Sequence, residues 1–233
     1  MATQATQAIL LPELLVSDLA GTAMQDEGST LRAYRTTLSE LAIPFTEADL
    51  AARRGASKAA VLRELAARAY PESEVAAIAR KALARFDAAV RDDLETCQVR
   101  EVDGAEAAFR RLKQSGVKLA ITSGHERGVL DLLLRRLGWQ ELFDCVVAGD
   151  EVPLGRPAPF LIYRAMMALG VPDAGRVAIV GDTPLDLQSG TNARAGWVIG
   201  VLGGAHGLET LGRTPHTHLL PTVASLPALF GLA

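Results

Sequence analysis

The sequence predicts an α/β protein: a doubly wound parallel sheet with an inserted all-helical domain. Three observations point to this fold. From residue 104 onward, short apolar segments alternate with amphipathic ones, which is typical of strands and crossover helices. The apolar segments lack polar alternation, as in strands buried on both faces. Between residues 29 and 97 the pattern is helical throughout.

The first predicted strand is Ile9–Ser17, which ends at the loop Asp18-Leu-Ala-Gly-Thr22. The later strands are predicted at Val117–Ile121, Phe143–Ala148, Arg176–Val180, Trp197–Val201 and, more weakly, His218–Leu220. The helices between and after them are predicted at Ala105–Ser115, Glu126–Leu137, Ala158–Leu169, Pro184–Ala195 and Val223–Phe230. Because such sheets bind ligands at the carboxyl ends of their strands, functional residues are expected just after the strands.

The inserted block is rich in Ala, Leu, Arg and Glu, with apolar residues at helical spacing. Its predicted helices are Thr30–Leu41, Ser57–Tyr70 and Ser73–Leu94, and Thr46-Glu-Ala-Asp49 has the N-cap chemistry of a further short helix. The predicted division is therefore a core of residues 1–26 and 98–233 and a helical cap of residues 27–97.

Composition narrows the class of protein. The chain has 233 residues, a net charge of −3 and 5% aromatic residues, which gives no indication of nucleic acid or an anionic membrane as a partner. Its two cysteines have no metal-binding spacing and favour reduced thiols in a cytoplasmic protein. Residues 1–8 lack the features of a signal peptide, and no apolar segment is long enough for a membrane span.

Polar residues gather where the predicted strands end. Asp18 follows the first strand, and Thr122 and Ser123 follow the second. Arg156 lies in the loop after the third strand, and Asp182 with Asp186 follows the fourth. Taken singly, each has an ordinary structural explanation as a turn, cap or loop residue. Their joint order after successive strands instead predicts one site at one edge of the sheet.

These residue types suit chemistry at phosphorus. Asp18 and the Asp182/Asp186 pair could hold Mg²⁺, which prefers hard oxygen ligands and would offset the repulsion between a carboxylate and anionic oxygens. Asp18 could then attack phosphorus as a carboxylate nucleophile. Thr122 or Ser123 could hold a phosphoryl oxygen, and Arg156 could bind the same group. Amides near Gly21 would add donors.

The segments Asp18–Thr22, Thr122-Ser-Gly124, Gly155-Arg-Pro-Ala-Pro159 and Gly181-Asp-Thr-Pro-Leu-Asp186 resemble the four ordered motifs of the haloacid dehalogenase (HAD) superfamily. The resemblance covers nearly the whole chain and implies a Rossmann-like core. It implies metal ligation by the side chains of Asp18 and Asp182 and the carbonyl of Ala20, with Asp186 in support. It also implies substrate contacts from Gly21, Thr22, Gly55, Ser123, Gly124 and His125.

One position departs from the usual pattern. Superfamily phosphatases carry a second Asp, the general acid, two residues after the nucleophile, and here that residue is Ala20. A general acid typically contributes ~10²–10⁴-fold to the rate. Alanine at this position is typical of phosphonatase, phosphonoacetaldehyde hydrolase, in which a cap lysine forms a Schiff base with the substrate aldehyde. Gly55-Ala-Ser-Lys58 resembles its Gly-x-x-Lys pattern, and Arg156 its arginine.

The phosphonatase pattern is incomplete. Its methionine before the glycine is Arg54 here, its histidine after the lysine is Val61, and its tyrosine after the second motif is His125. His125 could shuttle protons or merely cap its helix. Lys58 could form the Schiff base, bind a substrate phosphate, or be a solvated charge.

Three hypotheses follow. The first is a cap-closing hydrolase acting on a small organophosphorus metabolite such as phosphonoacetaldehyde. The second is a phosphomonoesterase with an atypical proton donor, and the third is a non-catalytic binding protein on the same scaffold. A homodimer is a further option, since exposed cap helices mediate dimers in similar proteins.

Overall fold

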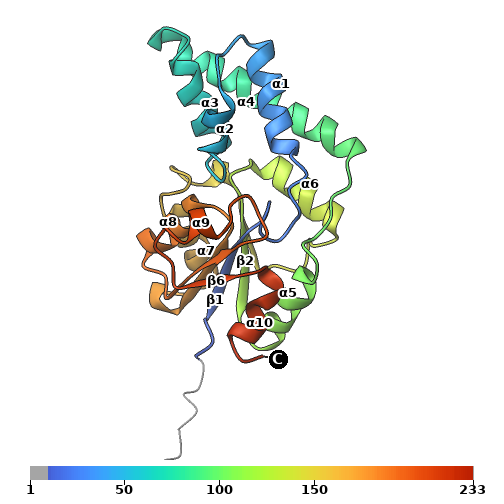
Figure 1. Cartoon of the computed structure of the whole chain (residues 1–233), viewed down its shortest axis with the longest axis vertical. Coiled ribbons are helices and arrows are strands. Elements are labelled where there is room, and N and C mark those ends of the chain that lie inside the picture. The colour runs from blue at the N-terminus through green and yellow to red at the C-terminus, as the bar shows by residue number, and fades with distance from the viewer. Residues whose placement is uncertain (1–9, 233) are drawn as a thin grey trace, which may run out of the picture.

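The computed structural model describes residues 10–232 and confirms the predicted parallel α/β fold (Figure 1). The sheet has the strand order β3-β2-β1-β4-β5-β6, with every neighbouring pair parallel. The strands are β1 (Leu14–Asp18), β2 (Lys118–Thr122), β3 (Cys145–Val147), β4 (Val177–Gly181), β5 (Trp197–Val201) and β6 (His218–Leu220). The winding reverses between β1 and β4, which is the switch point where such sheets bind ligands.

Two strand boundaries differ from the sequence prediction in a way that affects the site. β1 begins at Leu14 instead of Ile9, which itself lies outside the described residues. β1 and β2 each end one residue later than predicted, so Asp18 and Thr122 are the last residues of their strands and are paired with each other. Their backbones are therefore fixed by the sheet ladder and not by a loop.

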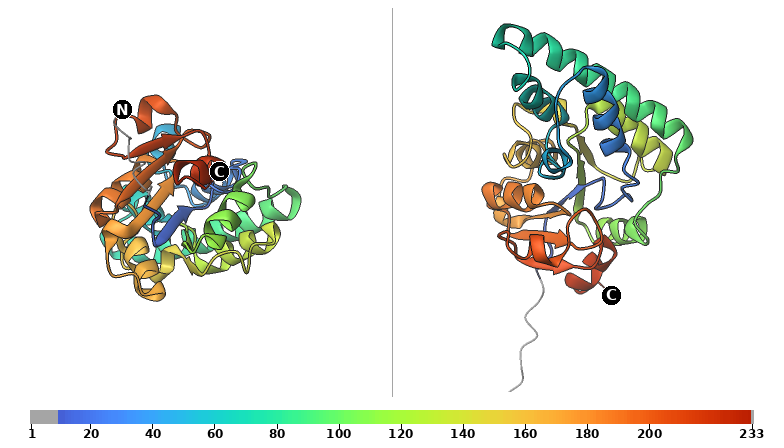
Figure 2. Two further views of the ribbon diagram at one scale, coloured as in Figure 1. Left: turned by 90° about the horizontal axis from the view of Figure 1, so that it is seen from below. Right: turned by 45° about the horizontal axis from the view of Figure 1, so that its top comes forward.

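Helices cover both faces of the sheet, as the view from below shows (Figure 2, left). One face carries α5 (Ala105–Gln114), α6 (Arg127–Leu137) and α10 (Leu226–Leu229), and the other carries α7 (Phe160–Leu169), α8 (Pro184–Ala193) and α9 (Leu208–Leu211). Short 3-10 turns occur at η1 (Gly149–Glu151), η2 (Ala174–Arg176) and η3 (Val223–Ser225). The helix predicted at Val223–Phe230 is thus split into η3 and α10, and α9 was not predicted.

The inserted block folds into four helices, as predicted, and lies over the carboxyl ends of the strands (Figure 1). These are α1 (Ser29–Glu40), α2 (Glu47–Ala51), α3 (Lys58–Ala67) and α4 (Glu72–Thr96), with α4 packed against both α1 and α3. The predicted N-cap at Thr46 is a full capping box with Asp49. Within residues 10–232, no helix combines the length and apolarity needed to cross a membrane.

The loop between α2 and α3 rests directly on the core (Figure 2, right). Gly55 has a φ of +82°, and a Cβ there would lie 2.6 Å from Thr183 Oγ1. A Cβ on Gly124 would lie 2.5 Å from the carbonyl oxygen of Ala56. The amide of Lys58 donates to the Gly124 carbonyl at 3.2 Å. Glycine at both positions therefore lets the cap approach the core to backbone contact.

Candidate active site

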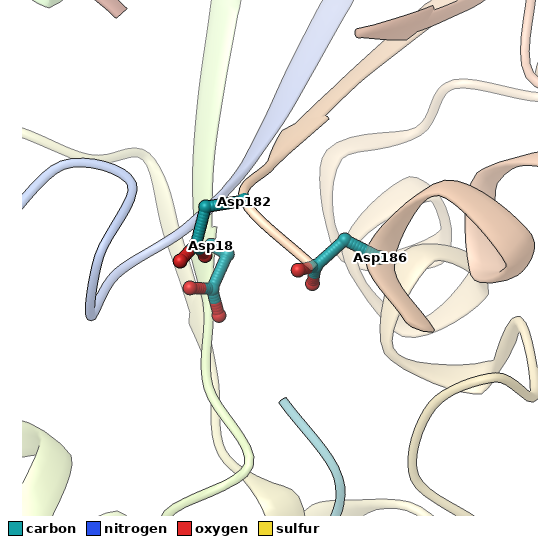
Figure 3. A group of neighbouring side chains, drawn as sticks. All are labelled: Asp18, Asp182 and Asp186. Atoms are coloured by element: carbon teal, nitrogen blue, oxygen red, sulfur yellow. The ribbon is translucent and has the colours of Figure 1, made fainter. Parts of the chain in front are cut away.

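The predicted polar residues converge at the switch point of the sheet. Asp18 ends β1, Asp182 follows β4, and Asp186 lies in the first turn of α8. Their carboxylates point into one space (Figure 3), with one oxygen from each lying within 4.8 Å of the others. Asp18 is 8% exposed, Asp182 1% and Asp186 4%, so three carboxylates share a site almost closed to water. Such a group can hold a metal ion.

Asp182 is oriented by the loops around it. Its Oδ1 accepts a hydrogen bond from Thr22 Oγ1 at 2.9 Å, and its Oδ2 accepts one from the amide of Ala205 at 2.7 Å. Gly21 has a φ of +87°, and a Cβ there would lie 2.2 Å from Asp182 Oδ2. Thr22 therefore orients the Asp182 carboxylate, and Gly21 leaves room for it. Neither residue lines the pocket, although both were expected to contact the substrate.

Burial disfavours the charged forms of two of these carboxyl groups. Burial raises the pKa of Asp18 to about 6, against a lowering by Arg156 and with a further rise from Asp186. Burial, with the charges of Asp18 and Asp186, raises the pKa of Asp182 to about 7. Both shifts mean that the ionised forms repel one another in a poorly solvated space. A divalent cation among these oxygens would relieve that repulsion, so the donor set fits Mg²⁺.

Arg156 links the cluster to the neighbouring strand. Its Nη1 lies 2.7 Å from Asp18 Oδ1, and its Nε lies 2.9 Å from Asp186 Oδ1. Its Nη2 donates to Thr122 Oγ1 at 2.7 Å, while the Thr122 hydroxyl donates to the Ser17 carbonyl at 3.3 Å. Arg156 is 7% exposed, so it is a fixed cation beside the Asp18 carboxylate. Thr122 orients Arg156 from behind the pocket.

Asp186 takes part in the capping box at the N-terminus of α8. Its Oδ2 accepts from the Thr183 amide at 3.0 Å and from Thr183 Oγ1 at 2.6 Å. The Asp186 amide in turn donates to Thr183 Oγ1 at 3.3 Å, which completes a capping box. Its other oxygen, Oδ1, lies 2.9 Å from Arg156 Nε, so both Asp186 oxygens have protein partners.

Lys58 faces the cluster from the cap. It is the first residue of α3 and is only 6% exposed, and its Nζ donates to the Ala56 carbonyl at 3.2 Å. Burial lowers the pKa of Lys58 to about 8, against a smaller rise from the Asp18 charge. The expectation of a solvated charge is therefore wrong. A substantial fraction of this amine is neutral slightly above neutral pH, which a nucleophilic lysine needs.

His125, in the loop after β2, lines the pocket together with Lys58. Its Nε2 lies 3.2 Å from Thr30 Oγ1, and its ring stacks on Phe86 with centroids 6.0 Å apart. Burial, with a smaller contribution from Lys58, holds the pKa of His125 well below its usual value, so the ring is neutral. The N-cap of α6 is Glu126, without a side-chain capping bond. The alternative that His125 caps its helix is therefore wrong.

The pocket above Asp18 brings together most of the residues predicted for the site. It is lined by Asp18, Ala20, Gly55, Lys58, Ser123, Gly124, His125, Arg156 and Asp182. Gly21, Thr22, Thr122 and Asp186 lie behind it and position its lining. Nine further lining residues were not predicted, namely Asp26, Thr30, Leu31, Tyr34, Leu50, Arg53, Arg54, Thr183 and Ala205. On the sequence alone these belong to helices and to loops, so no local signal distinguishes them.

Comparisons with known proteins identify the family of this chain and proteins that share its fold. The family of haloacid dehalogenase-like hydrolases matches residues 15–199. Phosphonoacetaldehyde hydrolase of Parabacteroides distasonis is 32% identical over 108 residues, which cover 45% of this chain and 40% of that protein. This chain thus aligns with less than half the length of the curated relative.

Two solved structures share the fold over nearly the whole chain. A hydrolase from Pseudomonas syringae superposes with a TM-score of 0.82 at 20% identity, covering 95% of this chain and 99% of that one. A phosphonoacetaldehyde hydrolase-like protein from Oleispira antarctica superposes with a TM-score of 0.79 at 17% identity, covering 99% and 95%. At these identities the likeness supports the fold and not a substrate.

Proposed function

Because this chain belongs to the haloacid dehalogenase-like hydrolases, we propose that it cleaves the carbon–phosphorus bond of a small phosphonate such as phosphonoacetaldehyde. One observation carries the proposal: Ala20 leaves the pocket without the usual general acid, while Lys58 is buried opposite Asp18 with a pKa lowered to about 8. An amine of this kind can form a Schiff base with an aldehyde, which removes the need for an acid at residue 20.

The proposed cofactor is Mg²⁺, held by the side chains of Asp18 and Asp182 and the carbonyl of Ala20, with Asp186 in support. Mg²⁺ would supply charge neutralisation between Asp18 and the anionic phosphonate oxygens. Asp182 is held rigidly for this role by its bonds from Thr22 and Ala205. Arg156 would bind a phosphonate oxygen beside Asp18, which it already contacts.

In the proposed reaction, the neutral Lys58 amine adds to the substrate aldehyde and loses water to form an imine. An Asp18 oxygen then attacks phosphorus, and the electrons of the C–P bond pass to carbon and are taken up by the protonated imine as an enamine. Protonation and hydrolysis of the enamine release acetaldehyde and restore Lys58. Water attack on the aspartyl-phosphate at Asp18 releases phosphate.

The proposed division of labour follows the domains, with a core of residues 1–26 and 98–233 and a cap of residues 27–97. Asp18 and Arg156 belong to the core, and Lys58 belongs to the cap. Cap closure through Gly55 and Gly124 would therefore assemble the two halves of the site around the substrate and exclude water.

A combined experiment tests the proposal. With phosphonoacetaldehyde and Mg²⁺, the enzyme should release phosphate and acetaldehyde in equal amounts, and borohydride added during turnover should attach the substrate carbons to Lys58. Lys58→Ala should abolish both results, whereas Lys81→Ala, on the exposed side of α4, should change neither. An undiminished adduct in Lys58→Ala would contradict the Schiff base.

The phosphomonoesterase hypothesis gives a different outcome in the same assay. It requires turnover of phosphate esters that survives Lys58→Ala, with the acid supplied from elsewhere. His125 is a poor source, because burial holds its pKa well below the usual value and leaves the ring uncharged at neutral pH. Efficient, Lys58-independent ester hydrolysis would favour this alternative over C–P cleavage.

A further inference from the structure

Two residues that line the pocket each carry a buried polar atom without a partner. Among the described residues, the Tyr34 hydroxyl and His125 Nδ1 have no hydrogen bond. Tyr34 is 4% exposed and His125 3%, and both side chains line the pocket above Asp18. An unpaired buried polar group is unfavourable to folding, so its presence in a pocket suggests that a ligand or water completes it.

A third group in the same pocket lining is only weakly held. Arg54 Nη1 lies 3.7 Å from Asp26 Oδ2, beyond hydrogen-bonding distance, and its side chain is 29% exposed. The neighbouring Arg53 is different, because its Nη2 bonds Glu64 Oε1 at 2.5 Å and its Nη1 bonds the Asp49 carbonyl at 2.7 Å. Arg54 is therefore the lining arginine whose donors remain available within residues 10–232.

These three groups come from separate segments that meet at the pocket. Tyr34 lies on α1, Arg54 in the loop before α3, and His125 in the loop after β2. If the Thr30 hydroxyl donates to His125 Nε2, then His125 Nδ1 carries the hydrogen and is a donor without a partner on a residue that lines the pocket. Tyr34 and Arg54 are donors as well. Three donors of this kind match an oxyanion and not an apolar tail.

We infer that the wall formed by Tyr34, Arg54 and His125 is a second subsite, which binds a carboxylate on the carbon skeleton of the substrate. The phosphorus group lies at the other end, against Asp18 and Arg156. The inference rests on the proposed function for the position of that group. It narrows the substrate class from small organophosphorus compounds in general to those that also carry a carboxylate.

A pair of uncleavable ligands tests the subsite without turnover. 3-Phosphonopropionate and propylphosphonate have three carbons each and differ in the terminal carboxylate. In calorimetric titrations of the full chain with Mg²⁺, 3-phosphonopropionate should bind about tenfold more tightly. Equal affinities in the wild-type protein would overturn the inference.

Matched variants locate the effect. Arg54→Met and Tyr34→Phe should each remove most of the carboxylate preference and leave propylphosphonate binding unchanged. Arg63→Met, at an exposed ion pair with Glu72, and Tyr70→Phe, whose hydroxyl donates to the Leu41 carbonyl, are the controls and should keep the preference. A preference that survives both Arg54→Met and Tyr34→Phe would place the carboxylate elsewhere and contradict the subsite.

Turnover separates this inference from the proposed function. If phosphonoacetaldehyde and its carboxylated analogue 3-phosphonopyruvate are cleaved with equal kcat/KM, the proposed function holds and the subsite fails. If phosphoglycolate alone is hydrolysed, with loss on Arg54→Met, the subsite holds and the C–P chemistry fails. A kcat/KM at least about tenfold higher for 3-phosphonopyruvate than for phosphonoacetaldehyde supports both.

Discussion

At the scale of single residues, the site is a balance of buried charges. Asp18 and Asp182 are each disfavoured as anions by burial, and Arg156 partly compensates Asp18 through a 2.7 Å contact. Lys58 is disfavoured as a cation for the same reason. Burial therefore disfavours the charged forms of the carboxylates and of the lysine. A bound metal ion and substrate would stabilise these charged forms.

The first prediction concerns the nucleophile. Asp18→Asn keeps the shape of the side chain but removes the charge of the proposed nucleophile, so phosphate release should fall by at least about 10⁴-fold. The exposed Asp92→Asn on α4 is the matched control and should retain full activity. An Asp18→Asn enzyme with near-normal turnover would mean that another group attacks phosphorus.

The second prediction concerns pH. The pKa of Lys58 is lowered from 10.5 to about 8, so the neutral amine accumulates as the pH rises through about 8. The initial rate of borohydride-trapped adduct should therefore rise between pH 7 and 9 and then level off. A rate that is flat across this interval, or that keeps rising toward 10.5, would show that Lys58 is not the attacking amine in this environment.

At the scale of elements, the site depends on how the loop between α2 and α3 meets the core. Gly55 accepts a left-handed conformation at a point where its backbone touches Thr183, and Thr183 in turn caps α8. Arg156 Nη1 also donates to the Gly55 carbonyl at 3.4 Å. A short loop thus couples the position of Lys58 to the strand ends that hold Asp18 and Asp182.

The third prediction follows from this contact. In Gly55→Ala the new Cβ would lie 2.6 Å from Thr183 Oγ1 at a φ of +82°, so the cap cannot close fully. We expect kcat/KM to fall at least about tenfold, because a small misplacement of Lys58 is costly to catalysis. Gly138→Ala, with a φ of +72° and no atom within 4 Å of its Cβ, carries similar backbone strain without the clash. Equal activity in the two variants would contradict the role of cap contact.

At the scale of the whole molecule, the fold brings segments distant in sequence to one edge of the sheet. β1 lies between β2 and β4, so the loops that follow these two strands lie on either side of Asp18. The helical block then covers this edge (Figure 1). Metal binding at this edge should consequently raise the free energy of unfolding of the chain.

The fourth prediction is a stabilisation by Mg²⁺. If the ion binds the folded carboxylate cluster and not the unfolded chain, saturation at 100 times its dissociation constant adds about 2.7 kcal/mol to the free energy of unfolding. Thermal unfolding should therefore shift upward with Mg²⁺ and return on chelation. Asp182→Asn should show little of this shift, while Asp173→Asn, which removes a carboxylate from a turn outside the cluster, should keep it. A shift of equal size in Asp182→Asn would argue against the cluster as the site.

The sequence by itself determined the alternation of strands and helices, the helical insertion and the motif residues Asp18, Arg156, Asp182 and Asp186. These follow from local periodicity and from the rule that parallel sheets bind ligands at their strand ends. The sequence also determined that the position two residues after Asp18, where the related phosphatases carry an acid, is Ala20.

Only the tertiary structure decided which polar groups are buried and what they touch. Lys58 and His125 read as helix-terminal polar residues in sequence, and both are almost fully enclosed once the cap lies on the core. The same packing places Thr22 against Asp182 and makes Tyr34 and Arg54 part of the pocket lining. Burial and long-range contact set the charge state of a side chain, and neither is encoded within the few residues around it.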